Sequence, residues 1–434
     1  MTWAPPPIDP VRTSDALPRD CEVAIIGGGI VGLMAALTLA ERGVPVVVFE
    51  KGTLAGEQSS RNLGWVRKTG RELPDLPLAM ESDRLWDIMP QRVGRDVGFR
   101  RTGILYCVRN EAQLAPHEAW LDAVGDHHLG SRLVSNAVIA DLVPGGQEGW
   151  YGGIYTPSDG KAEPQLAASA IARAAMAKGA VIIEQCAVRG LSLAAGRVAA
   201  VVTERGELPC KVAILAGGVW SRRFLGNYDV SLPTLPVIAS VLRTKPIVGP
   251  TDIAVGAPDF SFRKDHSGGF TITQRGGFIA PLALDSLLLA RQFAPVLRKE
   301  WRQIRLSLGR HFLDDLALPR RWQSTGPSPF EKQRTINPDV SQTLNAEALA
   351  NLRAAWPVFK DAQVARSWAG MIDITPDANP VISPVDAISG LILASGFSGH
   401  GFGTAPAAGG LAADLAMGTR PIVDPAPYTL SRFR

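Results

Sequence analysis

Near the start of the chain, two short apolar runs flank a longer segment that has the composition of a helix. The run "VAII" (23–26) predicts a buried strand, and "VPVVVF" (44–49) predicts a second one. Between them, residues 30–42 have the composition of a helix, with Gly43 placed to end it. A strand, a helix and a strand in this order are typical of a doubly wound α/β sheet.

A related pattern returns in the middle of the chain. Residues 163–183 predict a helix followed by a strand, and residues 186–221 predict a hairpin and a strand that ends in Ala-Gly-Gly. Residues 260–279 alternate like two strands joined by Ser-Gly-Gly, which places them in a second sheet. Residues 285–306 predict an amphipathic helix that is broken near Pro295.

The C-terminal part ends in an unusual stretch, "GFSGHGFGTAPAAGG" (396–410). It follows an apolar run, "LILA" (391–394), and precedes a helix-like run, "GLAADLAM" (410–417). We therefore expect a strand, a glycine-rich turn and a helix. Such a turn brings backbone N–H groups close to a negatively charged ligand.

Composition bounds the class of protein. The chain has 434 residues, of which 46% are hydrophobic and 20% charged, as expected for a soluble globular protein of two domains. The net charge of +4 comes without any run of Lys and Arg, which argues against a nucleic-acid partner. No apolar segment reaches the roughly 18–20 residues of a membrane span, and the N-terminus lacks a signal-peptide core.

The cysteines and histidines suggest neither a disulfide centre nor a metal site. Cys21, Cys107, Cys186 and Cys210 are far apart and form no CxxC pair. This argues against a redox-disulfide flavoenzyme and predicts a reducing, cytoplasmic compartment. The adjacent histidines of "GDHHLG" (125–130) point apart and lack further ligands, so we expect no bound metal.

The first βαβ pattern carries a dinucleotide fingerprint. Gly27 allows the tight bend, Gly29 the close approach of a pyrophosphate, and Gly32 the packing of helix against strand. Glu50 ends the second strand, where an acid accepts hydrogen bonds from a ribose diol. These residues alone fit NAD or FAD; the second glycine-rich strand end favours a long dinucleotide that lies across the sheet.

Together, the GxGxxG–Glu50 unit, "AGGVWS" (216–221), "WAGMIDITPDANPVI" (368–382) and "GFSGHGFGTAPAAGG" resemble the D-amino-acid oxidase superfamily, close to its sarcosine oxidase, glycine oxidase and dimethylglycine dehydrogenase branches. The resemblance implies a mixed α/β fold, with a doubly wound, Rossmann-like FAD-binding domain (1–90, 155–228 and 368–434) and an inserted mixed-sheet substrate domain (91–154 and 229–367). It also implies noncovalent FAD and oxidation of an amine C–N bond by hydride transfer to flavin N5, which gives an imine that water hydrolyses.

The resemblance also implies site residues. The expected FAD-contacting residues come from several segments of the chain: Gly27, Gly29, Ile30, Val31, Gly32, Glu50, Lys51, Ser59, Ser60, Arg61, Asn62, Leu63, Val188, Ala216, Gly217, Trp220, Gly396, Gly399, His400, Gly401, Phe402 and Gly403. Arg67 and His400 are the expected catalytic-site residues, Arg67 as the ligand of a substrate anion. His400 is expected either as a base or as a packed, hydrogen-bonded histidine.

Three departures from the family shape these expectations. Relatives hold the substrate carboxylate with a Lys where this chain has Gly403, or with an Arg where it has Ile372. No cysteine follows Cys210, which excludes a cysteinyl flavin link near the "TPD" motif. Oxidase relatives also place a Lys beside flavin N5, and the matching strand "GGFTITQ" (268–274) offers Thr271 instead.

The predicted function is FAD-dependent oxidation of an amino acid or a secondary or N-methylated amine. A dehydrogenase is favoured over an oxidase, and a quinone, another protein or O₂ is the electron acceptor. The alternatives are an FAD monooxygenase and a subunit that holds FAD inside a larger complex. The expected location is the cytoplasm, with peripheral contact to the inner membrane kept open. Substrate identity, stereochemistry and oligomeric state are left open by the sequence.

Overall fold

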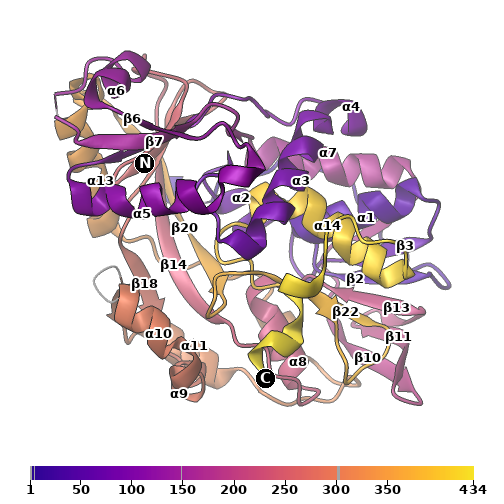
Figure 1. Ribbon diagram of the computed structural model, residues 1–434. Coiled ribbons are helices and arrows are strands. Elements are labelled where there is room, and N and C mark those ends of the chain that lie inside the picture. The colour runs from indigo at the N-terminus through magenta and orange to yellow at the C-terminus, as the bar shows by residue number, and fades with distance from the viewer. Residues whose placement is uncertain (1, 4, 148, 301–303) are drawn as a thin grey trace.

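The computed structural model describes residues 2–3, 5–147, 149–300 and 304–434 (Figure 1). One sheet has the strand order β21-β22-β13-β2-β3-β9, and its strands are parallel except for β21 at one edge. Its strands are β2 (Val23–Ile26), β3 (Val46–Phe49), β9 (Val181–Ile183), β13 (Val212–Leu215), β21 (Val381–Pro384) and β22 (Leu391–Ser395). The predicted parallel, doubly wound unit is confirmed.

Helices cover one face of this sheet and a small antiparallel sheet covers the other (Figure 1). The helical layer consists of α1 (Ile30–Glu41), α3 (Leu76–Asp87), α7 (Pro164–Ala177) and α14 (Gly401–Met417), and the small sheet of β10 (Val188–Ala194), β11 (Arg197–Thr203) and β12 (Gly206–Pro209). Helix α1 is almost wholly buried, because its sequence "IVGLMAALTLAE" has apolar residues on every side.

The C-terminal glycines differ from the expectation. We predicted a turn over 396–410 and a helix from residue 410, but α14 begins at Gly401 and the turn is confined to residues 396–400. The glycines inside α14 serve helix packing: a Cβ on Gly409 would overlap Met34 and Ala35 of α1. The chain therefore gives up helix propensity at Gly409 in exchange for close contact between two buried helices.

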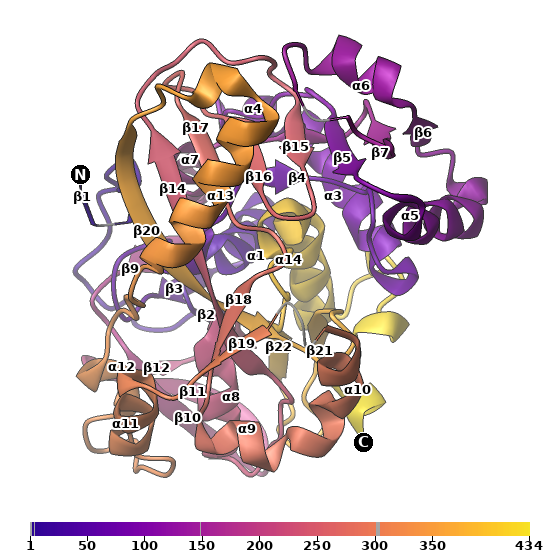
Figure 2. The same cartoon turned by 90° about the vertical axis from the view of Figure 1, so that its left-hand side faces the viewer.

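A larger mixed sheet lies beside the first (Figure 2). Its strand order is β1-β20-β14-β17-β16-β15-β5-β7-β6, with β18 and β19 attached at β14. The strands are β1 (Thr2–Trp3), β5 (Ile104–Val108), β6 (Arg132–Val134), β7 (Gly152–Thr156), β14 (Leu235–Thr244), β15 (Ala254–Gly256), β16 (Ser261–Lys264), β17 (Phe270–Thr273), β18 (Phe278–Pro281), β19 (Ile304–Ser307) and β20 (Val364–Ile374). Strands β16 and β17 confirm the pair predicted over 260–279.

Helix α13 (Gln342–Ala355) packs on the larger sheet and buries an aromatic core with it (Figure 2). The other elements are short or lie at the edges: α2 (Gln58–Arg61), α4 (Met89–Val93), α5 (Glu111–Ala123), α6 (Asn136–Leu142), α8 (Ser221–Gly226), α12 (Pro329–Lys332), β4 (Trp65–Val66) and β8 (Gly160–Lys161). Within the described residues, no helix combines the length and the apolar composition needed to cross a membrane.

A helical insert follows β18 and lies at the lower edge of the molecule in both views (Figures 1 and 2). It contains α9 (Leu284–Leu288), α10 (Ala290–Glu300) and α11 (Arg310–Ala317). The predicted break near Pro295 was wrong, because the helix is interrupted at Leu289 and Pro295 lies inside α10. Pro295 sits within the first two turns of α10, where the proline ring has a shorter stretch of preceding helix to disrupt.

Candidate active site

The turn after β2 is built as the glycine pattern predicts. Gly27 has a φ of +116°, and a Cβ there would overlap the carbonyl oxygen of Ala216, directly after β13. A Cβ on Gly32 would overlap the carbonyl oxygen of Gly27, so the first turn of α1 can pack on β2 because Gly32 has no side chain. These contacts fix the N-terminus of α1 at the carboxyl ends of the parallel strands.

Glu50 closes this end of the cleft. Its carboxylate accepts hydrogen bonds from the backbone N–H groups of Gly28 (2.8 Å) and Gly52 (2.7 Å). Burial raises the pKa of Glu50 above its ordinary value, while the charge of Lys51 and the two N–H groups act in the opposite direction. The carboxylate therefore holds the glycine turn in shape, and its remaining lone pairs are available to hydroxyl donors.

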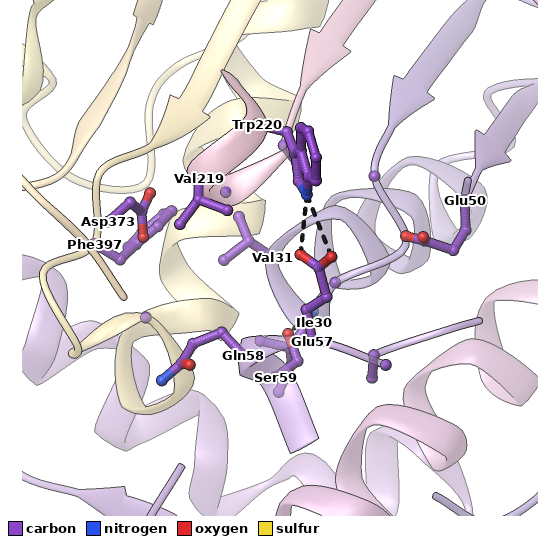
Figure 3. Close-up of a pocket in the computed structure, with 18 of the residues that line it drawn as sticks. Ile30, Val31, Glu50, Glu57, Gln58, Ser59, Val219, Trp220, Asp373 and Phe397 are labelled. Carbon is purple, nitrogen blue, oxygen red and sulfur yellow. Dashed lines mark hydrogen bonds between the residues drawn. The ribbon is translucent and has the colours of Figure 1, made fainter. Parts of the chain in front are cut away.

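A cleft of about 1280 Å³, part of it open to solvent, runs from Glu50 across the strand ends to Asp373 and Phe397 (Figure 3). The predicted residues that line it are Gly27, Gly29, Ile30, Val31, Glu50, Lys51, Ser59, Asn62, Val188, Ala216, Gly217, Trp220, Gly399, Gly401 and Phe402. The predicted residues outside the lining are Gly32, Ser60, Arg61, Leu63, Gly396, His400 and Gly403.

The middle of the cleft contains an acid, Glu57, that the sequence analysis did not single out. Glu57 accepts hydrogen bonds from the indole Nε1 of Trp220 at 3.2 Å (Figure 3) and from Lys51 Nζ at 3.1 Å. Lys51 Nζ also lies 4.2 Å from the centre of the Trp220 ring, as a cation–π contact. Glu57 and its neighbour Gln58 directly precede the predicted segment 59–63, and no repeat or motif marks them.

Arg61 is structural in its contacts. Its guanidinium donates to the carbonyl oxygens of Gly56 (2.6 Å), Ile336 (2.9 Å) and Ala369 (3.2 Å) and to Asn337 Oδ1 (2.7 Å). These bonds tie α2 to residues 336–337 and to β20. The guanidinium is thereby engaged with the protein, and it reaches the cleft only indirectly, through the position of α2.

At the far end of the cleft lies a buried carboxyl group that the sequence analysis did not single out. Asp373 of β20 is 8% exposed and accepts a hydrogen bond from Gly396 N–H at 2.6 Å. Burial raises its pKa to about 6, against the opposing effect of that hydrogen bond. Asp373 therefore holds the first residue of the turn that precedes α14.

The structure brings together the two predicted catalytic residues. The Nη2 of Arg67 lies 3.1 Å from Nε2 of His400, and Arg67 also contacts the carbonyl oxygen of Thr69. Burial, together with the charges of Arg71 and Arg67, lowers the pKa of His400 well below its ordinary value. Because guanidinium can only donate, Nε2 accepts from Arg67 and the imidazole proton is assigned to Nδ1.

A second guanidinium lies within electrostatic reach of Arg67. Arg275, in the loop between β17 and β18, lies 4.3 Å from the ring centre of Tyr106, and its pKa is lowered by burial and by the charge of Arg67. Trp65 meets Tyr106 edge to face at 5.7 Å. Among the described residues, neither Arg67 nor Arg275 has a carboxylate within ion-pairing distance. We call Arg67, Arg275, Tyr106, Trp65 and His400 the arginine pocket.

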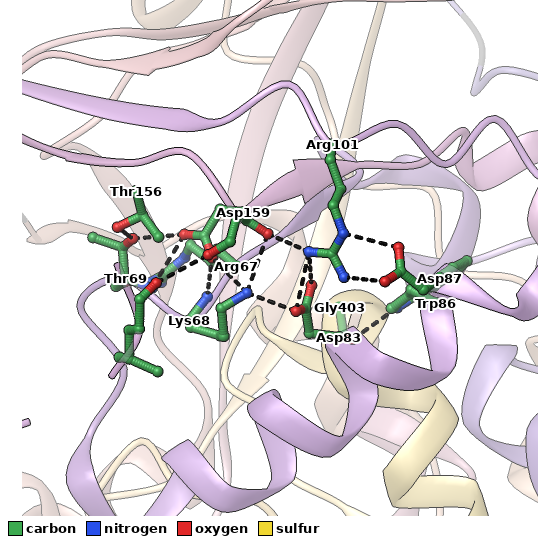
Figure 4. A network of polar contacts seen from close by, with 12 residues as sticks. Arg67, Lys68, Thr69, Asp83, Trp86, Asp87, Arg101, Thr156, Asp159 and Gly403 are labelled. Carbon is green, nitrogen blue, oxygen red and sulfur yellow. Dashed lines mark hydrogen bonds and ion pairs between the residues drawn. The ribbon is translucent and has the colours of Figure 1, made fainter. Parts of the chain in front are cut away.

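A polar network holds the segment that carries Arg67 (Figure 4). The fully buried carboxylate of Asp159 accepts from the backbone N–H of Lys68 (2.8 Å) and from the hydroxyl of Thr69 (2.6 Å). Lys68 Nζ pairs with Asp83 at 2.7 Å, and Trp86 Nε1 donates to the carbonyl of Gly403 at 2.9 Å. These bonds fix residues 67–69 relative to the start of α14.

The donor and acceptor groups of the cleft fit a long dinucleotide. A carboxylate suited to a ribose diol lies beside the N-terminus of α1, where a pyrophosphate is favoured. The other end offers the N-terminus of α14 and apolar walls from Phe397, Phe402 and Met371. The residues present therefore fit FAD: an acid, a helix N-terminus and an apolar, partly enclosed end follow one another in one continuous cleft.

Comparisons with known proteins agree with this geometry. The profile of the family described as "FAD dependent oxidoreductase" (DAO) matches residues 22–415. The glycine oxidase of Pseudomonas aeruginosa is 27% identical over 94% of this chain and 97% of its own length. Mouse mitochondrial sarcosine dehydrogenase is 24% identical over 98% of this chain and 42% of its own length.

Among solved structures, L-amino acid deaminase from Proteus myxofaciens, in complex with anthranilate, superposes with a TM-score of 0.95. It is 31% identical in sequence, with 99% of this chain and 97% of that chain covered. Glycine oxidase from Geobacillus kaustophilus superposes with a TM-score of 0.77 at 22% identity, over 96% of this chain and 99% of that one.

Proposed function

The chain belongs to the DAO family of FAD-dependent oxidoreductases, and we propose that within it the substrate is an amino acid whose carboxylate is held by Arg67 and Arg275. The family and its relatives make it an FAD-dependent enzyme that oxidises the C–N bond of an amino acid or amine. The proposal concerns which of these two substrate classes it uses.

One observation carries this choice. Neither Arg67 nor Arg275 has a carboxylate partner among the described residues, and burial together with the charge of Arg67 lowers the pKa of Arg275. The two guanidinium groups therefore repel each other, and an anion bound between them would relieve the repulsion and gain bidentate hydrogen bonds. A carboxylate is the anion that an amino acid offers and a simple amine lacks.

The chain's own residues would then prepare the substrate for oxidation. Arg67 and Arg275 bind and orient the carboxylate, and His400 accepts from Arg67 through Nε2 while keeping its proton on Nδ1. Trp65 and Tyr106 pack edge to face beside the two arginines and would offer the substrate an apolar surface. Bound FAD supplies the two-electron acceptor for the C–N bond. In this arrangement His400 is a positioning residue for Arg67.

We also propose that FAD is bound by the predicted residues that line the cleft, with Glu57, Gln58, Phe397 and Asp373 added to them. The predicted residues outside the lining would support the site from behind: Gly32 through helix packing and Arg61 through its bonds to residues 336–337 and β20. The division into an FAD-binding domain (1–90, 155–228, 368–434) and a substrate domain (91–154, 229–367) stays a proposal of the same kind.

The direct test is an anaerobic screen of amino acids and N-methyl amines against the purified holoenzyme, followed by loss of flavin absorbance. We expect bleaching by at least one amino acid and none by the corresponding amine that lacks the carboxylate. Equal bleaching by the decarboxylated amine would refute a carboxylate-binding role. Acid or heat precipitation of the same sample should release intact FAD into the supernatant, since no cysteine follows Cys210.

For the electron acceptor we propose a quinone or another protein rather than O₂. Thr271 is fully buried on β17, and its strand neighbours are Arg243 on β14 and Arg263 on β16. Both cations are neutralised: Arg263 by Glu163 (2.6 Å) and Arg243 by Asp265 (2.9 Å). Thr271 therefore has no unpaired cation as a strand neighbour, and an unpaired cation at that place is what would stabilise developing superoxide; Arg67 and Arg275 are assigned to the substrate carboxylate. Fast reoxidation by air-saturated buffer with stoichiometric peroxide would make the enzyme an oxidase instead.

We further propose that the helical insert contacts a membrane surface, while the predicted cytoplasmic location stays a prediction. Exposed leucines on this insert are Leu287, Leu288, Leu297, Leu306, Leu308, Leu313 and Leu316. Exposed Arg291, Arg298 and Arg305 lie among them, and this mixture suits an anionic lipid interface. The protein should sediment with anionic vesicles, and exchange of Leu287 and Leu288 for Ser should weaken the binding. Equal recovery of both proteins would contradict the proposal.

A further inference from the structure

Two cysteines lie opposite each other at the amino ends of neighbouring parallel strands. Strands β2 and β13 pair with Val23 opposite Val212, and the pairing extends backward through a hydrogen bond from Cys21 N–H to the carbonyl of Pro209 (3.0 Å). Cys21 and Cys210 therefore occupy matching positions. Both belong to the same apolar cluster, on the side of the sheet covered by β10–β12.

The two thiols interact directly. A hydrogen bond between them lowers the pKa of Cys210 and raises that of Cys21, because one shared proton can stabilise just one thiolate. Adjacent strands bring their backbones to about 4.8 Å, which is within the range of roughly 4.4–6.8 Å that a disulfide requires between Cα atoms. Both cysteines are free thiols in this structure.

The pair is slightly more exposed than the other two cysteines. Cys21 and Cys210 are 7% and 6% exposed, whereas Cys107 and Cys186 are 1% and 0% exposed. Burial raises the pKa of the Cys186 thiol, which makes its thiolate scarce at neutral pH. The pair therefore combines a thiol of lowered pKa with a second thiol on the neighbouring strand.

We propose that Cys21 and Cys210 form a peroxide-sensitive thiol pair that converts reversibly into a disulfide. The oxidant is a hydroperoxide such as hydrogen peroxide. The Cys210 thiolate attacks the O–O bond and becomes a sulfenic acid, and hydroxide leaves and is protonated to water. The Cys21 sulfur then attacks the sulfenic sulfur, the S–S bond forms, and a second water molecule leaves. The two sulfurs lose two electrons, and the peroxide gains them.

This site is separate from the amine chemistry and does not rest on it. The thiol pair lies at the amino ends of β2 and β13, whereas the cleft begins at their carboxyl ends, at Gly27 and Ala216. The disulfide would close the long loop between residues 21 and 210, and crosslinks over long loops stabilise a fold most in the chain-entropy description. We therefore expect oxidation to raise the thermal midpoint while FAD retention is unchanged.

The test uses the full-length holoenzyme, reduced, freed of reductant and titrated with hydrogen peroxide. Alkylation under denaturing conditions should show the loss of two of the four thiols, and digestion should yield a Cys21–Cys210 crosslinked peptide that a thiol reductant cleaves. Cys21→Ser should leave a sulfenic acid on Cys210 that dimedone traps. Cys210→Ser should retain its remaining thiols. Cys186→Ser is the matched control and should form the crosslink as the parent does.

The crosslinked peptide is read on the unmodified protein, so the proposal is tested even where a variant fails to fold. Retention of all four thiols, at peroxide levels that oxidise an exposed cysteine peptide in the same tube, would overturn it. So would thiol loss that proceeds equally in Cys21→Ser and Cys210→Ser, because random oxidation does not need the pair. Absence of a rise in thermal midpoint would overturn the stabilising effect alone.

Discussion

At the Glu50 end of the cleft, a buried carboxylate is held by the N–H groups of Gly28 and Gly52, whereas in the arginine pocket two guanidinium groups interact electrostatically without an acid to pair with. In the first region the charge of the carboxylate is already stabilised by hydrogen-bond donors of the protein. The second has an excess of positive charge that the described residues leave unbalanced. The first therefore has the properties of a preformed scaffold, and the second those of a site that awaits an anion.

The two regions also differ in how the chain builds them. The Glu50 end comes from one continuous βαβ unit, residues 22–50, together with the end of β13. The arginine pocket takes its members from β4 and the segment after it, from β5, from the loop between β17 and β18, and from the start of α14. Its formation depends on the register of the larger sheet and on the network around Asp159.

The largest effect should come from removing one of the two unpaired cations. Arg275→Ala should lower kcat/KM for the amino acid substrate by roughly 100- to 10,000-fold, since two charge-assisted hydrogen bonds are each worth about 1.5–3 kcal/mol. FAD content should stay at the parent level, because Arg275 does not line the cleft. Arg291→Ala, an exposed arginine of the helical insert, is the control.

Arg67→Ala should cause a loss of similar size, and Arg67→Lys should restore little of it because the bidentate fork is missing. A variant at either position with parental kcat/KM would remove that arginine from substrate binding. A decarboxylated amine that is oxidised better by Arg275→Ala than by the parent would support the carboxylate role further.

The Glu50 end should respond in the opposite way. Glu50→Gln should weaken FAD binding by about 10- to 100-fold, because the amide accepts less strongly and places an NH₂ group against a backbone N–H, a loss of about 1.5–3 kcal/mol. Measured with FAD at saturation, the KM for substrate should be unchanged. Glu207→Gln, on the exposed β12, is the matched control. Parental FAD affinity in Glu50→Gln would mean that the cleft holds its ligand without this acid.

The contrast also explains what the sequence could predict. The glycine turn after β2, the place of Glu50 directly after β3 and the parallel strands were predicted correctly, because the residues that specify them are close together along the chain. Arg275 was missed because a single basic residue after a strand resembles many surface arginines, and its electrostatic contact with Arg67 joins segments that are far apart in the sequence, after β17 and after β4. Asp373 was missed although it lies inside the quoted motif at 368–382, since burial, not residue type, gives it its properties.

The start of α14 shows the same limit. Glycines between 401 and 410 indicate a turn by local propensity, yet the segment is helical because α1 and α3 pack against it. Contacts with Met34 and Ala35 favour residues without a side chain, and the helix forms despite its composition. Local preference predicted the wrong state here because packing between distant helices contributed more.

The smallest predicted effect concerns Asp373, which shares with the arginine pocket the lack of an opposite charge. Its pKa is raised from 3.8 to about 6, so the folded protein holds this proton more tightly than the unfolded chain. The stabilising contribution of protonated Asp373 is therefore complete below pH 4, and it is lost as the pH rises towards and through about 6. Asp373→Asn keeps an acceptor for Gly396 N–H and removes the ionisation, so at pH 7 the variant should be more stable by about 1–3 kcal/mol. The measurement is the free energy of unfolding of parent and variant between pH 5 and 7, at saturating FAD. The difference in free energy of unfolding between variant and parent should widen with pH. Parallel curves would mean that a cation or solvent compensates the charge of Asp373. Of the two sites, the arginine pocket would then be the one with uncompensated charge.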